Sequence, residues 1–293
     1  MVISYTQNLE KGVFGLPLSE SIRYAHSSIS YIDDITGIQC FGVIPTVVAK
    51  CGSFLKEEGL TVEGIFRLSG SAKRIGMLQT IFDTPDHYGM QLDWRGYTVH
   101  DAANVMRRFL NHLPEPVITL EYYRAFKNTM EFETLEDKIA AFQSLIERLP
   151  LAHQYLLLYL LDMLGLFART WESTRMDIAC LASVFAPGML SHPDDILNPA
   201  GYKESQRVLT FLIENQARFS MPRTMYATGP ECYSVTGFPS FFNEPNTSVD
   251  TLATVPSSSL RRSKTTPTKR HKYGEHEPPQ VIYVNRTSST GGK

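Results

Sequence analysis

The chain has 293 residues, a net charge of −2 and 43% hydrophobic residues. This length suffices for one large domain with a tail or for two small domains, and the apolar fraction is typical of a globular protein with a buried core. The near-neutral charge argues against a general attraction to nucleic acid or to membranes. The four cysteines lie far apart and form no CxxC pair, so the sequence predicts no disulfide framework.

The N-terminus lacks the basic start and apolar run of a signal peptide, so we expect a cytoplasmic protein with reduced thiols. The longest apolar stretch, from Tyr155 to Phe167, has thirteen residues and is interrupted by Asp162. A membrane span needs about 20 residues. We therefore expect a buried core helix here and no transmembrane segment.

The composition changes near Met221. Residues 13–220 carry successive amphipathic patterns, whereas residues 221–293 are rich in Gly, Pro, Ser and Thr and have little periodicity. The later part holds nine basic and five acidic residues, a charge of +4. The sequence thus predicts a flexible N-terminus over residues 1–12, one domain over 13–220 and a disordered basic tail over 221–293.

The apolar residues of the domain recur with a helical period, and no long alternating pattern typical of strands appears. We expect helices over residues 17–28, 43–58, 71–82, 101–112, 120–130, 135–148, 152–167, 175–185 and 203–218. Gly59 ends the second of these, Pro114 follows the fourth, and Pro187 with Gly188 is expected to break the chain after residue 185. The predicted fold class is all-α, a single domain of about eight or nine helices.

Two motifs stand out in this domain. Residues 64–71 read Gly-Ile-Phe-Arg-Leu-Ser-Gly-Ser, and residues 107–116 read Arg-Arg-Phe-Leu-Asn-His-Leu-Pro-Glu-Pro. Together they resemble the Rho GTPase-activating (RhoGAP) family, in which the arginine of the first motif is a finger inserted into the active site of another protein. The resemblance covers about residues 13–220 and implies the RhoGAP fold.

The residues around the arginine are suited to an exposed but fixed loop. Gly64 and Gly70 permit the backbone angles of a tight turn. Phe66 can anchor the loop in the core while the arginine points outward. Ser69 or Ser71 can cap the next helix and tie the loop to it.

Arg67 is the finger residue that the resemblance implies. In GTP hydrolysis, negative charge develops around the transferred phosphoryl group, and a guanidinium supplies several directed donors there. An arginine provided by a second protein is worth roughly 10³–10⁵ in rate. The chain would then be a GTPase activator for a Rho-family small GTPase, with no active site of its own. Without the motif, Arg67 would be read as an ordinary solvated arginine.

The second motif supplies support. The family has a basic residue, usually lysine, at the position of Arg107, where it holds the finger loop and contacts the GTPase. Pro116 is expected to line the docking groove. Two residues depart from the family pattern, because many members have an arginine at the position of Asn111 and an asparagine at that of Gly188. Both family side chains order the loop or contact the partner.

Further segments resemble the fungal branch of the family, which acts on RhoA-like GTPases in cell-wall and actin control. These are residues 13–18 (Val-Phe-Gly-Leu-Pro-Leu), 47–52 (Val-Val-Ala-Lys-Cys-Gly) and 185–193 (Phe-Ala-Pro-Gly-Met-Leu-Ser-His-Pro). In that branch the Pro-Gly pair is familiar and compatible with activity. The resemblance therefore favours a RhoA-like partner.

Other chemistry has little support in the sequence. There is no GxxxxGK[ST] phosphate loop, no HExxH motif and no metal-ligand spacing, so we expect no cofactor or metal of its own, and GTP and Mg²⁺ would belong to the partner. The departures at Asn111 and Gly188 leave open a second hypothesis, a scaffold or effector that binds GTP-loaded Rho with little activity. A helical hydrolase is a poorer third, because no nucleophile constellation is present.

The tail carries a basic, hydroxyl-rich stretch from Arg261 to Lys272. Such a stretch can contact anionic lipid or a partner, and phosphorylation would offset its charge. Recruitment to the inner face of the plasma membrane is one expectation, and a merely solubilising tail is the other.

Overall fold

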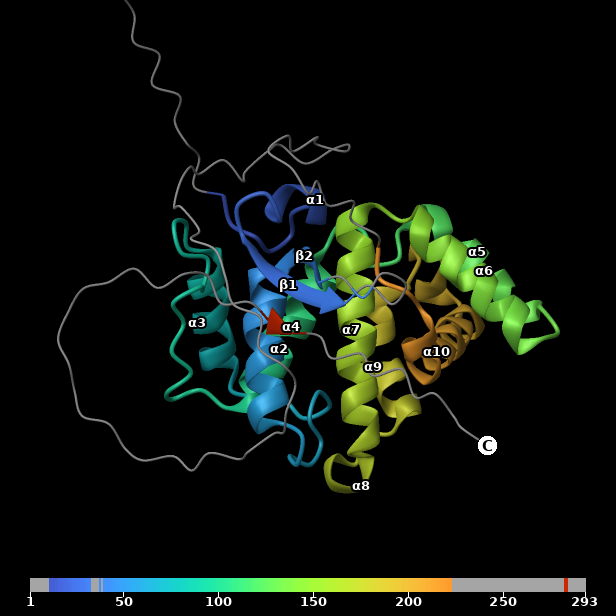
Figure 1. The fold of residues 1–293 in the computed structure, drawn as a ribbon. Helices are drawn as coiled ribbons and strands as arrows, with labels where there is room; N and C mark the ends of the chain where they lie inside the picture. The colour runs from blue at the N-terminus through green and yellow to red at the C-terminus, as the bar shows by residue number, and fades with distance from the viewer. Residues whose placement is uncertain (1–10, 33–36, 38, 223–281, 284–293) are drawn as a thin grey trace, which may run out of the picture. The chain divides into compact units, whose positions relative to one another are not determined.

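The computed structural model in Figure 1 describes residues 11–32, 37, 39–222 and 282–283. Almost all of the expected flexible N-terminus and of the expected disordered tail lies outside the described residues. The chain divides into one unit of residues 1–224 with 279–293 and a second unit of residues 225–278. All described residues belong to the first unit, which carries both motifs.

Helices make up most of this unit. The α-helices of the described chain are α1 (Leu18–Ser21), α2 (Thr46–Glu58), α3 (Ala72–Asp83), α4 (Val99–His112), α5 (Tyr123–Asn128), α6 (Leu135–Arg148), α7 (Leu151–Arg169), α8 (Trp171–Thr174), α9 (Ile178–Met189) and α10 (Pro199–Glu214). Four short 3₁₀ turns accompany them: Leu120–Tyr122, Thr129–Glu131, Pro193–Leu197 and Gln216–Arg218. Apart from the single turns α1 and α8, eight α-helices remain, which confirms the predicted helical domain.

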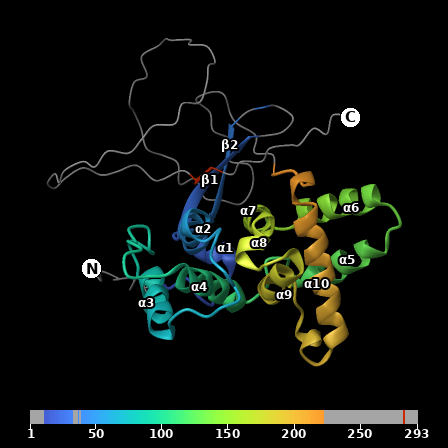
Figure 2. The same ribbon diagram turned by 90° about the horizontal axis from the view of Figure 1, so that it is seen from below.

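Helix α7 is the central element. In Figures 1 and 2, α2, α3 and α4 lie to one side of α7, and α5, α6 and α10 lie to the other. Helix α7 contacts α6, α9, α10 and the strand β2 (Gln39–Pro45). It is long and apolar enough to cross a membrane, but 78% of its apolar window is buried inside the domain. It is therefore the core helix that the sequence predicted.

An antiparallel hairpin of β1 (His26–Ile32) and β2 accompanies the helices and was not predicted. The two strands pair along their whole lengths, and β3 (Ile282–Tyr283) pairs in parallel with β1. The helix expected over 17–28 is reduced to the single turn of α1. The helix expected over 43–58 begins at Thr46, because the residues before it belong to β2.

The hairpin escaped detection because its strands do not alternate between apolar and polar residues. On β1 the buried positions include Ser27 and Ser30, and on β2 the apolar Phe41 is 45% exposed. Close packing against α7 also depends on a missing side chain, since a Cβ at Gly42 would overlap the ring of Tyr155. These features come from tertiary contact and leave little trace in the local pattern.

Helix α9 runs through Pro187 and Gly188 to Met189, so the predicted break after residue 185 is wrong. Proline has no N–H to donate to the carbonyl four residues earlier, which normally costs a helix stability. Here that carbonyl, on Ser183, accepts a hydrogen bond of 2.9 Å from the hydroxyl of Tyr202 on α10. A partner from another helix thus satisfies the acceptor that the proline leaves free.

The other boundaries agree with the sequence to within a few residues. Helix α6 spans Leu135–Arg148, as predicted. Helix α4 starts at Val99 because Thr98 and Asp101 form a capping box, each side chain accepting from the backbone N–H of the other. The helix expected over 120–130 is α5 flanked by two 3₁₀ turns.

Candidate functional site

Arg67 is exposed on the loop between α2 and α3. Its guanidinium makes no hydrogen bond or ion pair with any residue that the structure describes. Its carbonyl oxygen likewise accepts no hydrogen bond from the described part of the chain. The Asp177 carboxylate raises the pKa of the Cys180 thiol and the Arg67 charge opposes this shift, but the guanidinium forms no ion pair with either of these described residues. Both the guanidinium and the carbonyl of Arg67 can therefore contact another molecule.

The backbone before the arginine turns sharply. Gly64 has a φ of +68°, and the amides of Arg67 and Leu68 donate to its carbonyl at 3.0 and 2.8 Å. The amide of Gly64 donates in turn to the carbonyl of Thr174 at the end of α8, at 2.7 Å. The prediction that Gly64 permits a tight loop is confirmed, because the left-handed region strongly favours glycine.

Phe66 also has a left-handed backbone, with a φ of +67°. For a residue with a Cβ this conformation costs about 1–3 kcal/mol and persists only where the surroundings enforce it. The ring is completely buried and packs edge-on against Phe167 and Phe185, with centroid distances of 4.9 and 5.1 Å. The predicted anchor is confirmed: burial of this ring turns the next side chain outward.

Arg107 on α4 holds the same loop, as the resemblance implied. Its Nη1 donates a hydrogen bond of 2.8 Å to the carbonyl of Phe66, and its Nε is buried without a partner among the described residues. Burial lowers the pKa of the Arg107 guanidinium, although an arginine stays charged at any ordinary pH. A charged donor thus supports the loop one residue before Arg67.

Two further α4 residues hold the loop after the arginine, and sequence reasoning missed both. The side-chain amide of Asn104 donates to the backbone carbonyl of Leu68 at 3.0 Å. The carboxylate of Asp101 accepts from the backbone N–H of Ser71 at 2.8 Å. Asp101, Asn104 and Arg107 are spaced by three residues and so share one face of the helix. That spacing, counted back from Arg107, was the signal that could have identified them.

Asp101 is fully buried and carries several hydrogen bonds at once. Besides the amide of Ser71, it accepts from Nε of Arg74 at 2.6 Å and from the amide and hydroxyl of Thr98 at 2.8 and 2.9 Å. Burial alone would raise the pKa of Asp101, but the bonds from Arg74, Thr98 and Ser71 outweigh it and lower the pKa. The capping carboxylate of α4 is therefore also an anchor of the finger loop.

Because Asp101 holds the loop, the roles that the sequence suggested for Gly70, Ser69 and Ser71 change. Gly70 does not have a left-handed backbone; it is needed because a Cβ there would collide with the carboxylate of Asp101 and lie 2.8 Å from its amide nitrogen. Ser71 is the N-cap residue of α3, but its side chain makes no capping hydrogen bond. Ser69 is exposed. The backbone of Ser71 and not a serine hydroxyl ties the loop down.

The two departures from the family pattern lie against each other. Gly188 is buried, and a Cβ there would lie 2.8 Å from Oδ1 of Asn111 and 2.8 Å from Cβ of Leu110. Asn111 is exposed. Pro116 is buried, and the expectation that it lines the docking groove stays a prediction.

A groove of about 290 Å³ lies along α4 and is bordered by α3. It is lined by Ile75, Asn104, Arg107, Arg108, Asn111 and His112. Its basic side chains suit an acidic or polar surface of another molecule. No cluster of three metal-ligating side chains occurs among the residues that the structure describes.

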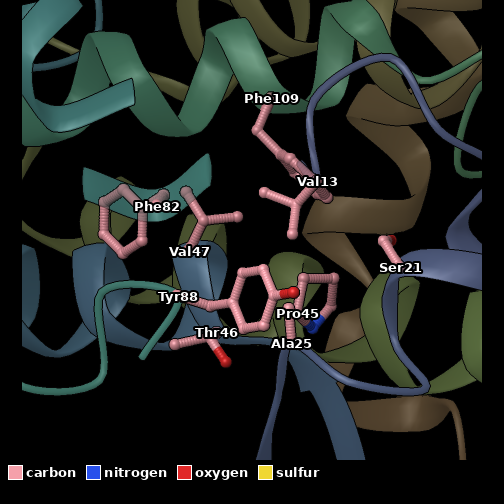
Figure 3. A pocket seen from close by; sticks show the side chains of 9 residues that line it. All are labelled: Val13, Ser21, Ala25, Pro45, Thr46, Val47, Phe82, Tyr88 and Phe109. Carbon is pink, nitrogen blue, oxygen red and sulfur yellow. The ribbon is translucent and has the colours of Figure 1, made fainter. Parts of the chain in front are cut away.

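A second concavity is a packing junction (Figure 3). Its lining is largely apolar and consists of Val13, Ser21, Ala25, Pro45, Thr46, Val47, Phe82, Tyr88 and Phe109. In Figure 3 the side chains of Val13, Val47 and Tyr88 point into the space between the N-terminal segment and α4. Burial raises the pKa of Tyr88, so this group stays a neutral phenol at ordinary pH. Nothing here matches an acid–base site.

The helical body and the fixed loop define a class of proteins, namely helical domains with an exposed arginine on a rigidly held loop. Comparison with known proteins identifies the family. Residues 45–194 match the model of the RhoGAP domain. The chain belongs to the RhoGAP domain family.

Two fungal proteins are similar in sequence. Rho-GTPase-activating protein 5 of Schizosaccharomyces pombe is 46% identical over 210 residues, which are 71% of this chain and 58% of that protein. Rho-GTPase-activating protein BAG7 of Saccharomyces cerevisiae is 38% identical over 207 residues, 69% of this chain and 50% of that protein. The aligned part thus spans 58% and 50% of the lengths of these two relatives. The resemblance to the fungal branch is confirmed.

A solved structure supports the fold. The crystal structure of human Rho GTPase activating protein 15 superimposes with a TM-score of 0.59 over 71% of this chain and 92% of that one, at 18% identity. At this identity the likeness concerns the fold alone.

Proposed function

We propose that this protein accelerates GTP hydrolysis by a Rho-type small GTPase by inserting Arg67 into the partner's nucleotide site. One observation carries the proposal: the guanidinium and carbonyl of Arg67 are free, while the backbone on both sides is fixed from α4. A group already held in its working geometry loses little freedom when the complex forms. The family membership and the names of the two fungal relatives support the same function.

In the proposed mechanism, the Arg67 guanidinium stabilises the charge that develops on the transferred phosphoryl oxygens. The free carbonyl of Arg67 accepts a hydrogen bond from the partner's catalytic glutamine and so orients it. GTP and Mg²⁺ belong to the partner, and the chain supplies no cofactor, metal or active site of its own. A rate gain of roughly 10³–10⁵ corresponds to about 4–7 kcal/mol of barrier.

The finer identity of the partner is also part of the proposal. Residues 13–18, 47–52 and 185–193 resemble the fungal branch that acts on RhoA-like GTPases in cell-wall and actin control, and this resemblance favours a RhoA-like partner. We place the protein in the cytoplasm, recruited to the inner face of the plasma membrane through the basic stretch Arg261–Lys272. That stretch lies outside the described residues, and its charge supports contact with anionic lipid.

Single-turnover hydrolysis of GTP by a panel of Rho-type GTPases tests the proposal. We expect the full chain to stimulate at least one of them, and Arg67→Ala to lose roughly 10³-fold or more of the stimulation while still binding the GTP-loaded partner. Arg148→Ala is a matched control, because Arg148 is an exposed arginine on α6, to the other side of α7 (Figure 1). Equal stimulation by Arg67→Ala and the parent protein would refute the finger role.

A scaffold that binds GTP-loaded Rho without activity is the second candidate. The contact between Gly188 and Asn111 favours it, since glycine offers the partner no side chain where many family members have an asparagine. Turnover separates the two functions. With an activator at one-hundredth of the GTPase concentration, the GTPase hydrolyses the whole GTP pool faster than it does alone, whereas a scaffold only binds its own equivalent of GTPase.

A further inference from the structure

We propose that Asn104 is a positioning residue for Arg67, acting through the carbonyl of Leu68. The inference rests on the proposed function and adds a residue that neither motif contains. Asn104 lies on α4, one helical turn before Arg107. The side-chain amide of Asn104 donates to the backbone just after Arg67, at Leu68, whereas the guanidinium of Arg107 donates to the backbone just before it, at Phe66.

The orientation of the Asn104 amide is fixed by its partners. Its Nδ2 donates to the carbonyl of Leu68 at 3.0 Å and to the carbonyl of His100, one turn earlier on α4, at 2.8 Å. Both partners are acceptors, so the nitrogen and not the oxygen must face them. The bond to His100 holds the amide on the helix, and the bond to Leu68 connects the helix to the loop.

The loop needs this bond because burial does not hold the loop after the arginine. Before it, the ring of Phe66 is fully buried. After it, the side chain of Leu68 is 48% exposed and Ser69 is exposed. Asp101 holds the backbone N–H of Ser71. Between Leu68 and Ser71, the hydrogen bond from Asn104 to the Leu68 carbonyl is the only one that a side chain among the described residues donates to the loop backbone.

Removal of the tether would let the Leu68 peptide rotate, since water can hydrate its carbonyl instead. The carbonyl of Arg67 belongs to the adjacent peptide unit, which, within the described residues, is then held only by the bond of 2.8 Å from the Leu68 N–H to the carbonyl of Gly64. With that single restraint, the directions of the Arg67 carbonyl and guanidinium would spread over more states. This weakens an interaction made chiefly in the transition state and leaves ground-state docking nearly intact. One neutral hydrogen bond of this kind corresponds to about a fivefold change in an equilibrium.

The test compares Asn104→Ala and Asn104→Asp with the control Asn215→Ala in the full chain. Asn215, the C-cap residue of α10, makes the same local bond, from its Nδ2 to the carbonyl of Phe211 four residues earlier at 2.9 Å, but in the described part of the chain it makes no hydrogen bond to the loop that carries Arg67. The aspartate variant keeps the size of the side chain and replaces the donor by an acceptor. Rates and KM come from stimulated hydrolysis. Affinities are measured for the GTPase with GDP–aluminium fluoride, which mimics the transition state, and with a non-hydrolysable GTP analogue.

We expect Asn104→Ala to lower the maximal stimulated rate about fivefold and Asn104→Asp to lower it further, with KM almost unchanged. Affinity for the transition-state mimic should fall by the same factor while affinity for the GTP analogue stays the same. A loss of both affinities alike would overturn the inference, because Asn104 would then be a direct docking contact. So would rates equal to those of Asn215→Ala. If the parent protein stimulates no GTPase at all, the proposed function fails instead.

Discussion

The guanidinium of Arg107 donates a hydrogen bond of 2.8 Å to the carbonyl of Phe66, forty-one residues earlier in the chain. The acceptor precedes the finger residue directly, and the ring of Phe66 is buried. A charged donor from α4 and an aromatic anchor in the core therefore fix the same peptide unit. Through this contact, the second sequence motif (residues 107–116) holds the loop formed by the first motif (residues 64–71) in place.

Arg107→Ala should reduce stimulated hydrolysis about ten- to hundredfold, because hydrogen bonds from charged groups are worth about 1.5–3 kcal/mol. Arg107→Lys keeps a charged donor but loses the planar fork, so an intermediate rate is expected. Single-turnover hydrolysis at saturating activator measures both. A lysine variant as poor as the alanine variant would show that the fork geometry, and not the charge, holds the loop.

Gly70→Ala should destabilise the protein by about 1–3 kcal/mol, since the new methyl group would push against the carboxylate and backbone of Asp101. Gly76→Ala is the matched control. Gly76 lies inside α3 with open space around its position, so alanine there should stabilise the helix by about 0.5–1 kcal/mol. Urea denaturation of both variants checks the prediction. Equal effects would mean that the loop yields easily at Gly70.

Asp101 should make stability depend on pH in the acid range. Its pKa is lowered in the folded protein, so the stabilisation it gives is present above the ordinary carboxyl pKa of about 4 and is lost as the pH falls through the lower folded value. Asp101→Asn removes this contribution and leaves Arg74 without its carboxylate. We expect the variant to be about 2 kcal/mol less stable at pH 7.

The measurement is urea denaturation of the Asp101→Asn variant and the parent between pH 3 and 7. The gap between the two proteins should narrow as the pH falls below 4, because only the parent loses a carboxylate at this position. A constant gap would contradict the assignment of a lowered pKa to Asp101.

The contact between Gly188 and Asn111 predicts coupling between these positions. Gly188→Ala should cost about 1–3 kcal/mol, because its methyl group would meet Leu110 and Oδ1 of Asn111. Adding Asn111→Ala removes one of these collisions and should recover part of the loss. A double-mutant cycle on the free energy of unfolding should therefore show an interaction of about 0.5 kcal/mol or more. Strictly additive effects would contradict this contact.

The sequence by itself predicted most of the helices and singled out Arg67 as the candidate finger residue. Helix α6 has the predicted bounds, and Arg67 and Phe66 stand exposed and buried, as the motif indicated. These features are local. A 3.6-residue period, a glycine that permits a turn and an aromatic anchor all act within a few residues of the chain.

Only the tertiary structure decided which side chains hold the loop that carries Arg67. It also decided that α9 continues through Pro187 and that β1 and β2 form a hairpin. Asn104 and Asp101 meet the loop only because α3 turns the chain back, so that residues about thirty to thirty-six positions apart come within hydrogen-bond distance. Likewise, α9 continues through Pro187 because the hydroxyl of Tyr202 on α10 donates a hydrogen bond to the carbonyl of Ser183. Such contacts depend on packing between distant segments, and the free energy of a buried polar group depends on the partners that packing brings to it.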